Sequence, residues 1–440
     1  MNVQKKLVVL SMILIIFLAA CSNNSNDSTA STAPSPTNTE AKTSPVPADL
    51  NFELDVMTWF YDETRQNLMK ETIAKFNEKY PNVKVNHNAN ENYAQAYKLA
   101  FDSGAGPELV YLDDLNQQIL EKNNNLLDIT EEVKQMGWMD KLMPGTIEYN
   151  NARHPGQYFS VGFIDYPRTL FYNKEIMDKL GLSAPQNLDE LIAQFATIKK
   201  AGFIPLEASS THMLWLIFSI VLNSVPAEDI DKWYYLVETT PAFEKAYIDA
   251  LVTVENWVKN GYFRDEITTI KSADVVTLYG RNETVFLLSG NSTANKIKDY
   301  PFPIGVTVFP NKDVNLPKTL VSAIDGSWAL NGDIDPMKKQ ASLDFIDTFM
   351  NPDIAQKWLE AGFSVTVNFD KTKVEMSPLM SETFKATENT RVGYFMDNAV
   401  PGILDLMIQL NQRLQVGDIT GKEYWELMNN KYIELVAENK

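Results

Sequence analysis

Cysteine and histidine are scarce in this sequence. Its 440 residues include one cysteine, Cys21, and three histidines, His87, His154 and His212. A single cysteine excludes an internal disulfide, so the fold must depend on its hydrophobic core. The histidines lie far apart and lack the spacing of metal ligands. The sequence therefore predicts no metal site, and we expect no bound cofactor.

Positive charge is also in short supply. The chain has 39 Lys and Arg against 57 Asp and Glu, which gives a formal net charge of −18. No basic run extends beyond pairs such as Lys199-Lys200 and Lys338-Lys339. Because nucleic-acid binding needs clustered cations at the phosphates, this composition argues against a nucleic-acid partner. We interpret the acidic surface as a solubility feature.

Only one long apolar run occurs, from Leu7 to Ala20, and Lys5 and Lys6 precede it. Its fourteen positions fall short of the ~20 that a helix needs to span a bilayer. A charged start, a short apolar centre and small residues at the end are typical of a signal peptide. We therefore predict that residues 1–20 are a signal peptide and that the chain is exported rather than integral to the membrane.

The single cysteine directly follows that run. Leu18-Ala19-Ala20-Cys21 resembles the lipobox of bacterial lipoproteins, which implies cleavage before Cys21 and lipidation of its sulfur. The alternative is a buried, inert thiol. The next residues are mostly Ser, Thr, Asn, Pro and Ala, a composition that cannot bury enough apolar area to fold. Residues 21–49 are therefore predicted to be a lipidated cysteine and a flexible tether.

The rest of the chain alternates strand and helix patterns. Strands are predicted at "LDVMTW", "VKVNHN" and "PELVYLDD". Helices between them are indicated by Met69, Ile73, Phe76 and Tyr80 at helical spacing before Pro81, and by the stretch around residues 93–101. This order predicts a parallel sheet covered by helices.

Later segments continue the pattern. Asn187 followed by Glu190 marks a helix start, and Gly202 marks its end. Helices are also predicted around residues 243–258 and 341–349, and a strand at "FPIGVTVFP". The body is too long for one ordinary core, so we predict an α/β fold with two lobes.

Motifs of enzyme chemistry are missing. There is no G-x-S-x-G, "GDITGKEY" lacks the glycine spacing of a phosphate loop, and "DIDPMKKQASLD" has Lys338 where a calcium loop needs glycine. The paired carboxylates of a glycoside hydrolase have no fixed sequence spacing. We expect a protein that is not an enzyme, with an anchored carbohydrate-active enzyme as the competing class.

Four segments in order resemble the extracellular solute-binding proteins of ABC importers, in particular the maltose-binding-protein-like sugar-binding family. They are "FNEKYPNVKV", "GPELVYLDD", "YFSVGFIDYPRTLFYNKEIMDKLGL" and "DGSWALNGDIDPMKKQASLDFIDTFMNPDIAQKWLEAG". The resemblance implies a periplasmic-binding-protein-like fold with a ligand cleft between the lobes. It implies a first lobe of residues 50–165 and 318–363 and a second lobe of residues 166–317 and 364–440. The crossings would lie near 164–168, 317–320 and 363–366.

The same resemblance implies a function. A carbohydrate would bind in the cleft and favour lobe closure, and the transmembrane subunits of an ABC permease would receive it. The receptor would be a monomer, attached through its N-terminal lipid to the outer face of a bacterial cell membrane. The alternative ligand is a non-sugar polar solute such as a peptide.

Candidate ligand contacts follow from two criteria. Ligands of open α/β sheets bind beyond the carboxyl ends of strands, and sugars need aromatic platforms beside polar groups. The candidates are Trp59, Tyr61, Glu63, Asp113, Asp114, Tyr166, Arg168, His212, Trp215, Asp325, Ser327, Trp328, Arg391 and Tyr394. Each has a plainer interpretation, since a tryptophan is more often core than platform, and Asp113 could simply cap a helix.

One departure from the family concerns the segment after "YGRNETVFLLSG". Many members carry Gly-x-Trp there, whereas Gly290 is followed here by Asn291 and Ser292. Either that aromatic platform is missing or another residue supplies it.

Overall fold

The structure is a computed structural model that describes residues 51–438, except 152, 153, 155, 237, 389 and 395–399. The predicted signal peptide, Cys21 and all of the predicted tether lie outside these residues. Among the residues described, no helix combines the length and apolar character needed to cross a membrane.

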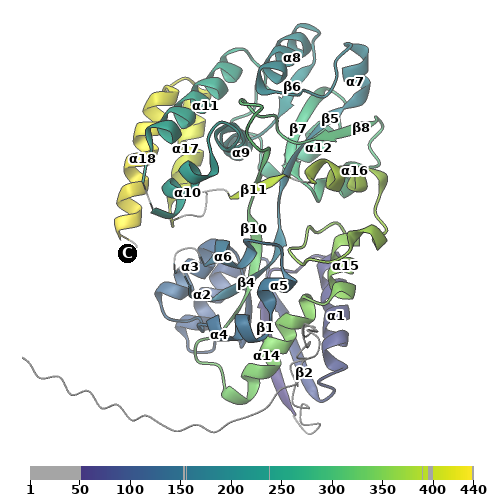
Figure 1. The fold of residues 1–440 in the computed structure, drawn as a ribbon, viewed down its shortest axis with the longest axis vertical. Helices are drawn as coiled ribbons and strands as arrows, with labels where there is room; N and C mark the ends of the chain where they lie inside the picture. Colours follow the sequence, from purple (N-terminus) through teal and green to yellow (C-terminus); the bar gives the residue numbers. More distant parts are fainter. Residues whose placement is uncertain are drawn as a thin grey trace, which may run out of the picture. The chain divides into compact units, whose positions relative to one another are not determined.

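The first lobe is built around a five-stranded sheet (Figure 1). Its N-terminal part contains β1 (Phe52–Thr58), α1 (Glu63–Asn77), β2 (Val83–Ala89), α2 (Tyr93–Asp102), β3 (Leu109–Leu112), α3 (Asp114–Lys122), α4 (Thr130–Gln135), α5 (Trp138–Lys141), α6 (Thr146–Asn150) and β4 (Ser160–Asp165). The chain later returns with β10 (Ile324–Leu330), α14 (Pro336–Phe349) and α15 (Pro352–Glu360).

The strand order of this sheet is β2-β1-β3-β10-β4. β1 pairs in parallel with β2 and β3, as the alternation of strands and helices predicts. β10 runs antiparallel to both β3 and β4, so the sheet is mixed rather than wholly parallel. The reason is that β10 enters from the second lobe and therefore runs in the opposite direction.

The second lobe has a four-stranded sheet of order β6-β7-β5-β8. Its elements are β5 (Arg168–Asn173), α7 (Lys174–Lys179), α8 (Leu188–Lys200), β6 (Ile204–Glu207), α9 (Ser210–Leu222), α10 (Ala227–Leu236), α11 (Pro241–Lys259), α12 (Val275–Tyr279), β7 (Thr284–Gly290), α13 (Thr293–Ile297), β8 (Ile304–Thr307), β9 (Thr319–Ser322), α16 (Pro378–Thr387), β11 (Arg391–Tyr394), α17 (Ile403–Gln415) and α18 (Gly421–Glu438). In Figure 1, α17 and α18 lie beside α11, and the three pack together.

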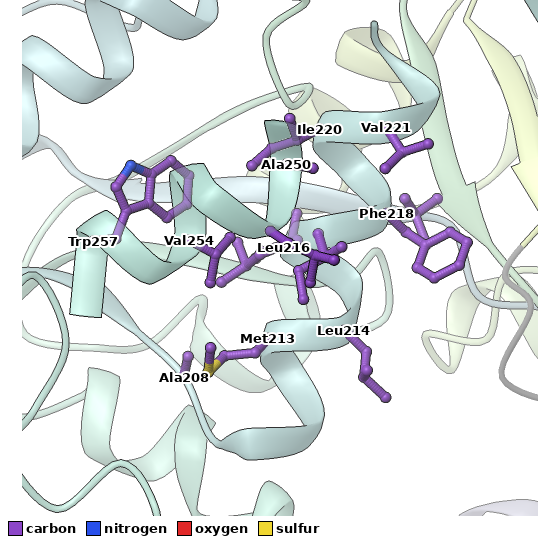
Figure 2. Packing of buried hydrophobic residues seen from close by; sticks show 14 of the residues in the cluster. Ala208, Met213, Leu214, Leu216, Phe218, Ile220, Val221, Ala250, Val254 and Trp257 are labelled. Carbon is purple, nitrogen blue, oxygen red and sulfur yellow. The ribbon is translucent and has the colours of Figure 1, made fainter. Parts of the chain in front are cut away.

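The core of the second lobe surrounds α9. This helix is apolar on nearly every side, and the side chains of Met213, Leu214 and Phe218 are buried. In Figure 2, Met213 points toward Ala208 while Leu214 points away from it. A helix that is apolar all round belongs inside a domain, so α9 holds the sheet and the C-terminal helices together.

The two ends of helix α8 have the capping residues that the sequence predicts. The Asn187 side chain accepts a hydrogen bond from the Glu190 N–H at 2.9 Å, and its amide donates to Glu190 Oε1 at 3.0 Å. Gly202 follows α8 with a φ of +88°, a conformation that glycine adopts without strain. The predicted start and end of this helix are therefore confirmed.

The chain passes between the two sheets at three places. Residues 166–167 join β4 to β5, and Ala323 joins β9 to β10. The third passage follows Val367, which pairs with Leu142 of the first lobe, and precedes α16, which packs on α13 and β8. Strand pairing thus places 319–322 with the second lobe and 364–367 with the first, a few residues away from the borders predicted at 318 and 364.

Candidate ligand-binding site

Two cavities meet beside the first passage between the lobes. The inter-lobe cavity, about 560 Å³, is lined by Asp62, Thr64, Arg65, Ile164, Asp165, Tyr166, Ser292, Asn295, Lys296, Asp325, Ala361, Gly362, Phe363 and Ser364. The second-lobe cavity, about 460 Å³, is lined by Tyr166, His212, Trp215, Ser272, Ala273, Val276, Thr277, Ser289, Thr293, Lys296 and Tyr300. Tyr166 and Lys296 line both cavities, so the two adjoin and are treated as parts of one candidate site.

A larger hollow of about 640 Å³ lies between α1, α5 and α14 of the first lobe. Its walls include none of the residues predicted to contact a ligand. Because it touches only one lobe, it cannot respond to lobe closure, and we do not assign the ligand to it.

Tyr166 is positioned by a glycine. β5 and β7 pair so that Arg168 lies opposite Gly290, and the Tyr166 ring rests on that glycine. A Cβ atom at position 290 would lie 2.3 Å from Cζ of Tyr166, closer than any real contact. Gly290 therefore allows an aromatic ring to reach the boundary of both cavities.

Arg168, Trp215 and His212 form a stack under the second-lobe cavity. The Arg168 guanidinium lies 4.1 Å from the centre of the Trp215 ring, and the His212 ring lies 4.2 Å from it. Cation–π contact of this kind fixes the indole in place. The stack thus makes Trp215 a rigid aromatic wall, which is the geometry required to pack against a sugar ring.

His212 is uncharged in this stack. It is 4% exposed, and its Nδ1 lies 2.8 Å from the Ser209 hydroxyl. Burial, with a further contribution from the positive charge of Arg168, lowers the pKa of His212 from 6.5 to about 3. A neutral imidazole is available as a polar group but not as a cation at physiological pH.

The inter-lobe cavity contains acids and cations side by side. Burial raises the pKa of Asp325, while Arg65 and Arg168 act against that shift. Burial likewise raises the pKa of Asp165, against which Ser364 and then Lys371 act. Asp62 pairs with Arg65 at 3.3 Å and caps α1. Each carboxylate in this cavity thus has a cation of the protein that acts on it.

Gly362 brings the lobes into contact at the edge of this cavity. It has a φ of +99°, and a Cβ atom there would lie 2.6 Å from Nδ2 of Asn295. Asn295 belongs to α13 of the second lobe, whereas Gly362 follows α15 of the first. The absence of a side chain lets the two lobes approach at this point.

The structure brings four predicted contacts into the cavities and places the others elsewhere. Tyr166, His212, Trp215 and Asp325 line them, and Arg168 lies beneath Trp215. Trp59 is 7% exposed and packs on Tyr93 and Tyr111, near the cavities but outside their walls. The remaining residues off the walls are Tyr61, Glu63, Asp113, Asp114, Ser327, Trp328 and Arg391. The side chain of Tyr394 lies outside what the structure describes.

Four of the predicted residues have a clear structural role. Trp328 is fully buried, with its ring 4.7 Å from that of Phe349, so it belongs to the core and corrects the prediction of a ligand platform. Asp113 accepts a hydrogen bond from the Asn116 N–H at 2.7 Å and is the N-cap of α3. Arg391 and Tyr394 are the ends of β11, which pairs with β9.

Several wall residues escaped the sequence reasoning. Asp165 and Arg65 carry charge into the inter-lobe cavity, and Lys296 and Tyr300 line the second-lobe cavity. Asp165 had a usable signal because it lies inside the predicted crossing. Lys296 had none, since one surface lysine looks like any other in the sequence.

Comparison with known proteins identifies the family. A family profile described as bacterial extracellular solute-binding protein matches residues 71–380, more than half of the chain. The chain belongs to this family.

Two curated relatives of this solute-binding protein have names that refer to sugars. The melibiose/raffinose/stachyose-binding protein MelE of Bacillus subtilis is 19% identical over 322 residues, which cover 70% of this chain and 73% of MelE. A probable sugar-binding periplasmic protein of Mesorhizobium japonicum is 32% identical over 80 residues, only 18% of this chain and 19% of that protein.

Solved structures share the fold of this solute-binding protein. A chitin oligosaccharide binding protein has a TM-score of 0.74 at 18% identity, covering 88% of this chain and 99% of its own. A Bacillus licheniformis sugar transporter in complex with stachyose has a TM-score of 0.64 at 18% identity, covering 87% and 100%. These likenesses show that the chain has the two-lobe solute-binding fold.

Proposed function

We propose that this solute-binding protein captures an oligosaccharide between its lobes and delivers it to an ABC permease. The observation that carries the proposal is the pair of adjoining cavities that share Tyr166. The rings of Tyr166, Trp215 and Tyr300 offer apolar faces beside hydroxyl groups, and the inter-lobe cavity adds amide and carboxylate groups. This combination matches the apolar faces and many hydroxyls of a sugar chain.

Lobe closure supplies the mechanism. The inter-lobe cavity has walls from both lobes, so a ligand there contacts both only when they approach. Such a ligand favours the closed state by its differential affinity for that state. The names of the relatives support a saccharide ligand, and membership of the solute-binding family supports delivery to a permease.

The competing enzyme class needs two carboxylates that face each other across the cleft. Asp165 and Asp325 come from adjacent antiparallel strands of one sheet, where Asp165 pairs with the neighbour of Asp325. This arrangement favours a binding role for both.

A thermal-shift screen of the complete chain, purified in detergent, tests the proposal. Oligosaccharides of several linkages are compared with peptides, and the mixtures are then analysed for cleavage products. A ligand that binds only the native state raises the melting temperature once its concentration exceeds Kd. We expect a shift with one saccharide series and no products; cleavage would establish an enzyme, and shifts with peptides alone would reject the saccharide.

We further propose that Cys21 carries a lipid that holds the receptor at the outer face of the membrane. The support is the lipobox-like sequence that ends at this cysteine. In the producing cells, Cys21→Ala should move the protein from the membrane fraction to the medium. Retention of the variant in the membrane fraction would reject the anchor.

A further inference from the structure

The second-lobe cavity differs in charge from the rest of the protein. The chain has a net charge of −18, yet none of the described residues that line this cavity is an aspartate or glutamate. Among those residues Lys296 is the one cationic side chain, and His212 is neutral. The other polar groups are hydroxyls. A hydroxyl oxygen of a neutral ligand can accept a hydrogen bond from the ammonium group of Lys296, but an anion gains a stronger one because the charges are opposite.

Lys296 is held at the cavity wall by its helix. Ala294 and Ile297 of α13 are fully buried in an apolar cluster with α16 residues such as Met380, while Lys296 is exposed. The backbone is therefore fixed on one side, and the ammonium group projects from the other. Replacing this side chain removes no core contact, so it should leave stability nearly unchanged.

The charge of Lys296 is not already used by the protein. Within the described part of the chain, no carboxylate lies within ion-pair distance of its Nζ. The acids of the inter-lobe cavity interact with other cations, namely Arg65, Arg168 and Lys371. Lys296 is thus left as a donor of charge-assisted hydrogen bonds to a ligand.

A second cation, Arg168, also contributes positive electrostatic potential to the second-lobe cavity. Arg168 is 5% exposed and lies behind the Trp215 ring that forms the cavity wall. Its effect is visible at His212, where it disfavours a further positive charge. Arg168 also acts on Asp325 of the inter-lobe cavity, so only part of its weakly screened charge favours an anion in the second-lobe cavity.

We propose that the second-lobe cavity binds a uronic acid unit of an oligosaccharide, with the sugar carboxylate at Lys296 and the sugar ring against Trp215. This inference rests on the proposed saccharide-binding function and specifies the chemical class of the ligand. Ser272, Thr277 and Thr293 line the same cavity and bring hydroxyl groups to it. The carboxylate thus gains the one free cation of the site among the described residues.

The test compares matched saccharides by isothermal titration calorimetry on the complete chain. Oligogalacturonides and oligoglucuronides are titrated beside the same molecules after chemical reduction of their carboxyl groups, which keeps length and linkage and removes the charge. We expect one acidic series to bind and its reduced form to bind at least tenfold more weakly. Hydrogen bonds to charged groups are worth about 10- to 100-fold in affinity.

Two lysine variants then locate the contact. Lys296→Gln should weaken the acidic ligand about tenfold or more and leave the reduced one unchanged, while Lys296→Arg keeps most of the affinity. Lys298→Gln is the control, because Lys298 is exposed two residues away and lines neither cavity. Equal losses in the Lys296→Gln and Lys298→Gln variants would indicate long-range charge alone and overturn the site.

Other outcomes separate this inference from the function on which it rests. If neutral saccharides bind and their acidic counterparts do not, the receptor function stands and the uronic acid inference is wrong. If no saccharide of either kind binds, the proposed function itself fails, and this inference fails with it.

Discussion

The two adjoining cavities differ in which lobes form their walls and in how their charged groups are paired. The inter-lobe cavity has walls from both lobes and holds acids and cations that act on one another. The second-lobe cavity draws its walls from one lobe and the adjoining Tyr166, and carries one lysine among rings and hydroxyls. The charged groups of the inter-lobe cavity act on one another, whereas the lysine of the second-lobe cavity is left for the ligand. A ligand can therefore meet the second-lobe cavity whether or not the lobes are closed.

The largest expected effect separates a core tryptophan from a cavity tryptophan. Trp328→Ala should lower the free energy of unfolding by about 3–5 kcal/mol, because it removes a fully buried ring from the first-lobe core. Trp215→Ala should cost less stability but weaken ligand binding, since its ring is a cavity wall. Urea unfolding and calorimetry on both variants measure the two effects. If both variants lost ligand affinity to a similar extent, the assignment of Trp328 to the core and of Trp215 to the cavity wall would be wrong.

The next effect concerns acid sensitivity in the second-lobe cavity. The pKa of His212 in the folded protein, about 3, lies below its ordinary value of 6.5. Between these two values the unfolded chain binds a proton at His212 and the folded protein does not. Stability is therefore lost as pH falls below about 6.5. Linkage gives a loss of about 2 kcal/mol between about pH 7 and pH 5 from this residue.

His212→Asn tests this loss while it preserves a polar partner for Ser209. Urea unfolding at several pH values should show that the free energy of unfolding of the variant falls less as the pH becomes acidic. An unchanged pH profile would mean that His212 is protonated in the folded protein. It would contradict the assignment of a neutral His212 to the cavity wall.

The smallest effect tests the residue that joins the cavities. Gly290→Ala would put a methyl group into the Tyr166 ring and displace it, so binding should weaken about tenfold, or 1.4 kcal/mol. In a Tyr166→Ala background the same change should have little effect, because the clash is gone. Calorimetry on the four proteins of this cycle measures the coupling. Additive effects would show that the ring does not depend on the glycine.

Local features of the fold could be predicted from the sequence. The Asn187 cap with Glu190 and the amphipathic pattern of α11 depend on neighbours a few residues away, so the sequence alone suffices. The antiparallel entry of β10 could not be derived from strand and helix alternation, because it depends on how the chain returns from the other lobe.

The candidate site divides in the same way. His212 and Trp215 could be found because they stand at the start of a strongly apolar helix. Lys296 could not, because its role comes from the absence of acids around it, and those neighbours are brought together only by the fold. Trp328 was misjudged for the opposite reason, since an interrupted apolar run looks the same whether its tryptophan faces a cleft or a core.

The glycine at position 362 affects how closely the two lobes can approach each other. Any side chain at this position would act as a wedge against Asn295, because even one added carbon would come within 2.6 Å of the amide nitrogen. Gly362 and Asn295 both line the inter-lobe cavity, so such a wedge would act at the edge of the candidate site itself. The missing side chain at Gly362 therefore permits the lobes to come as close at this edge as they do in the structure.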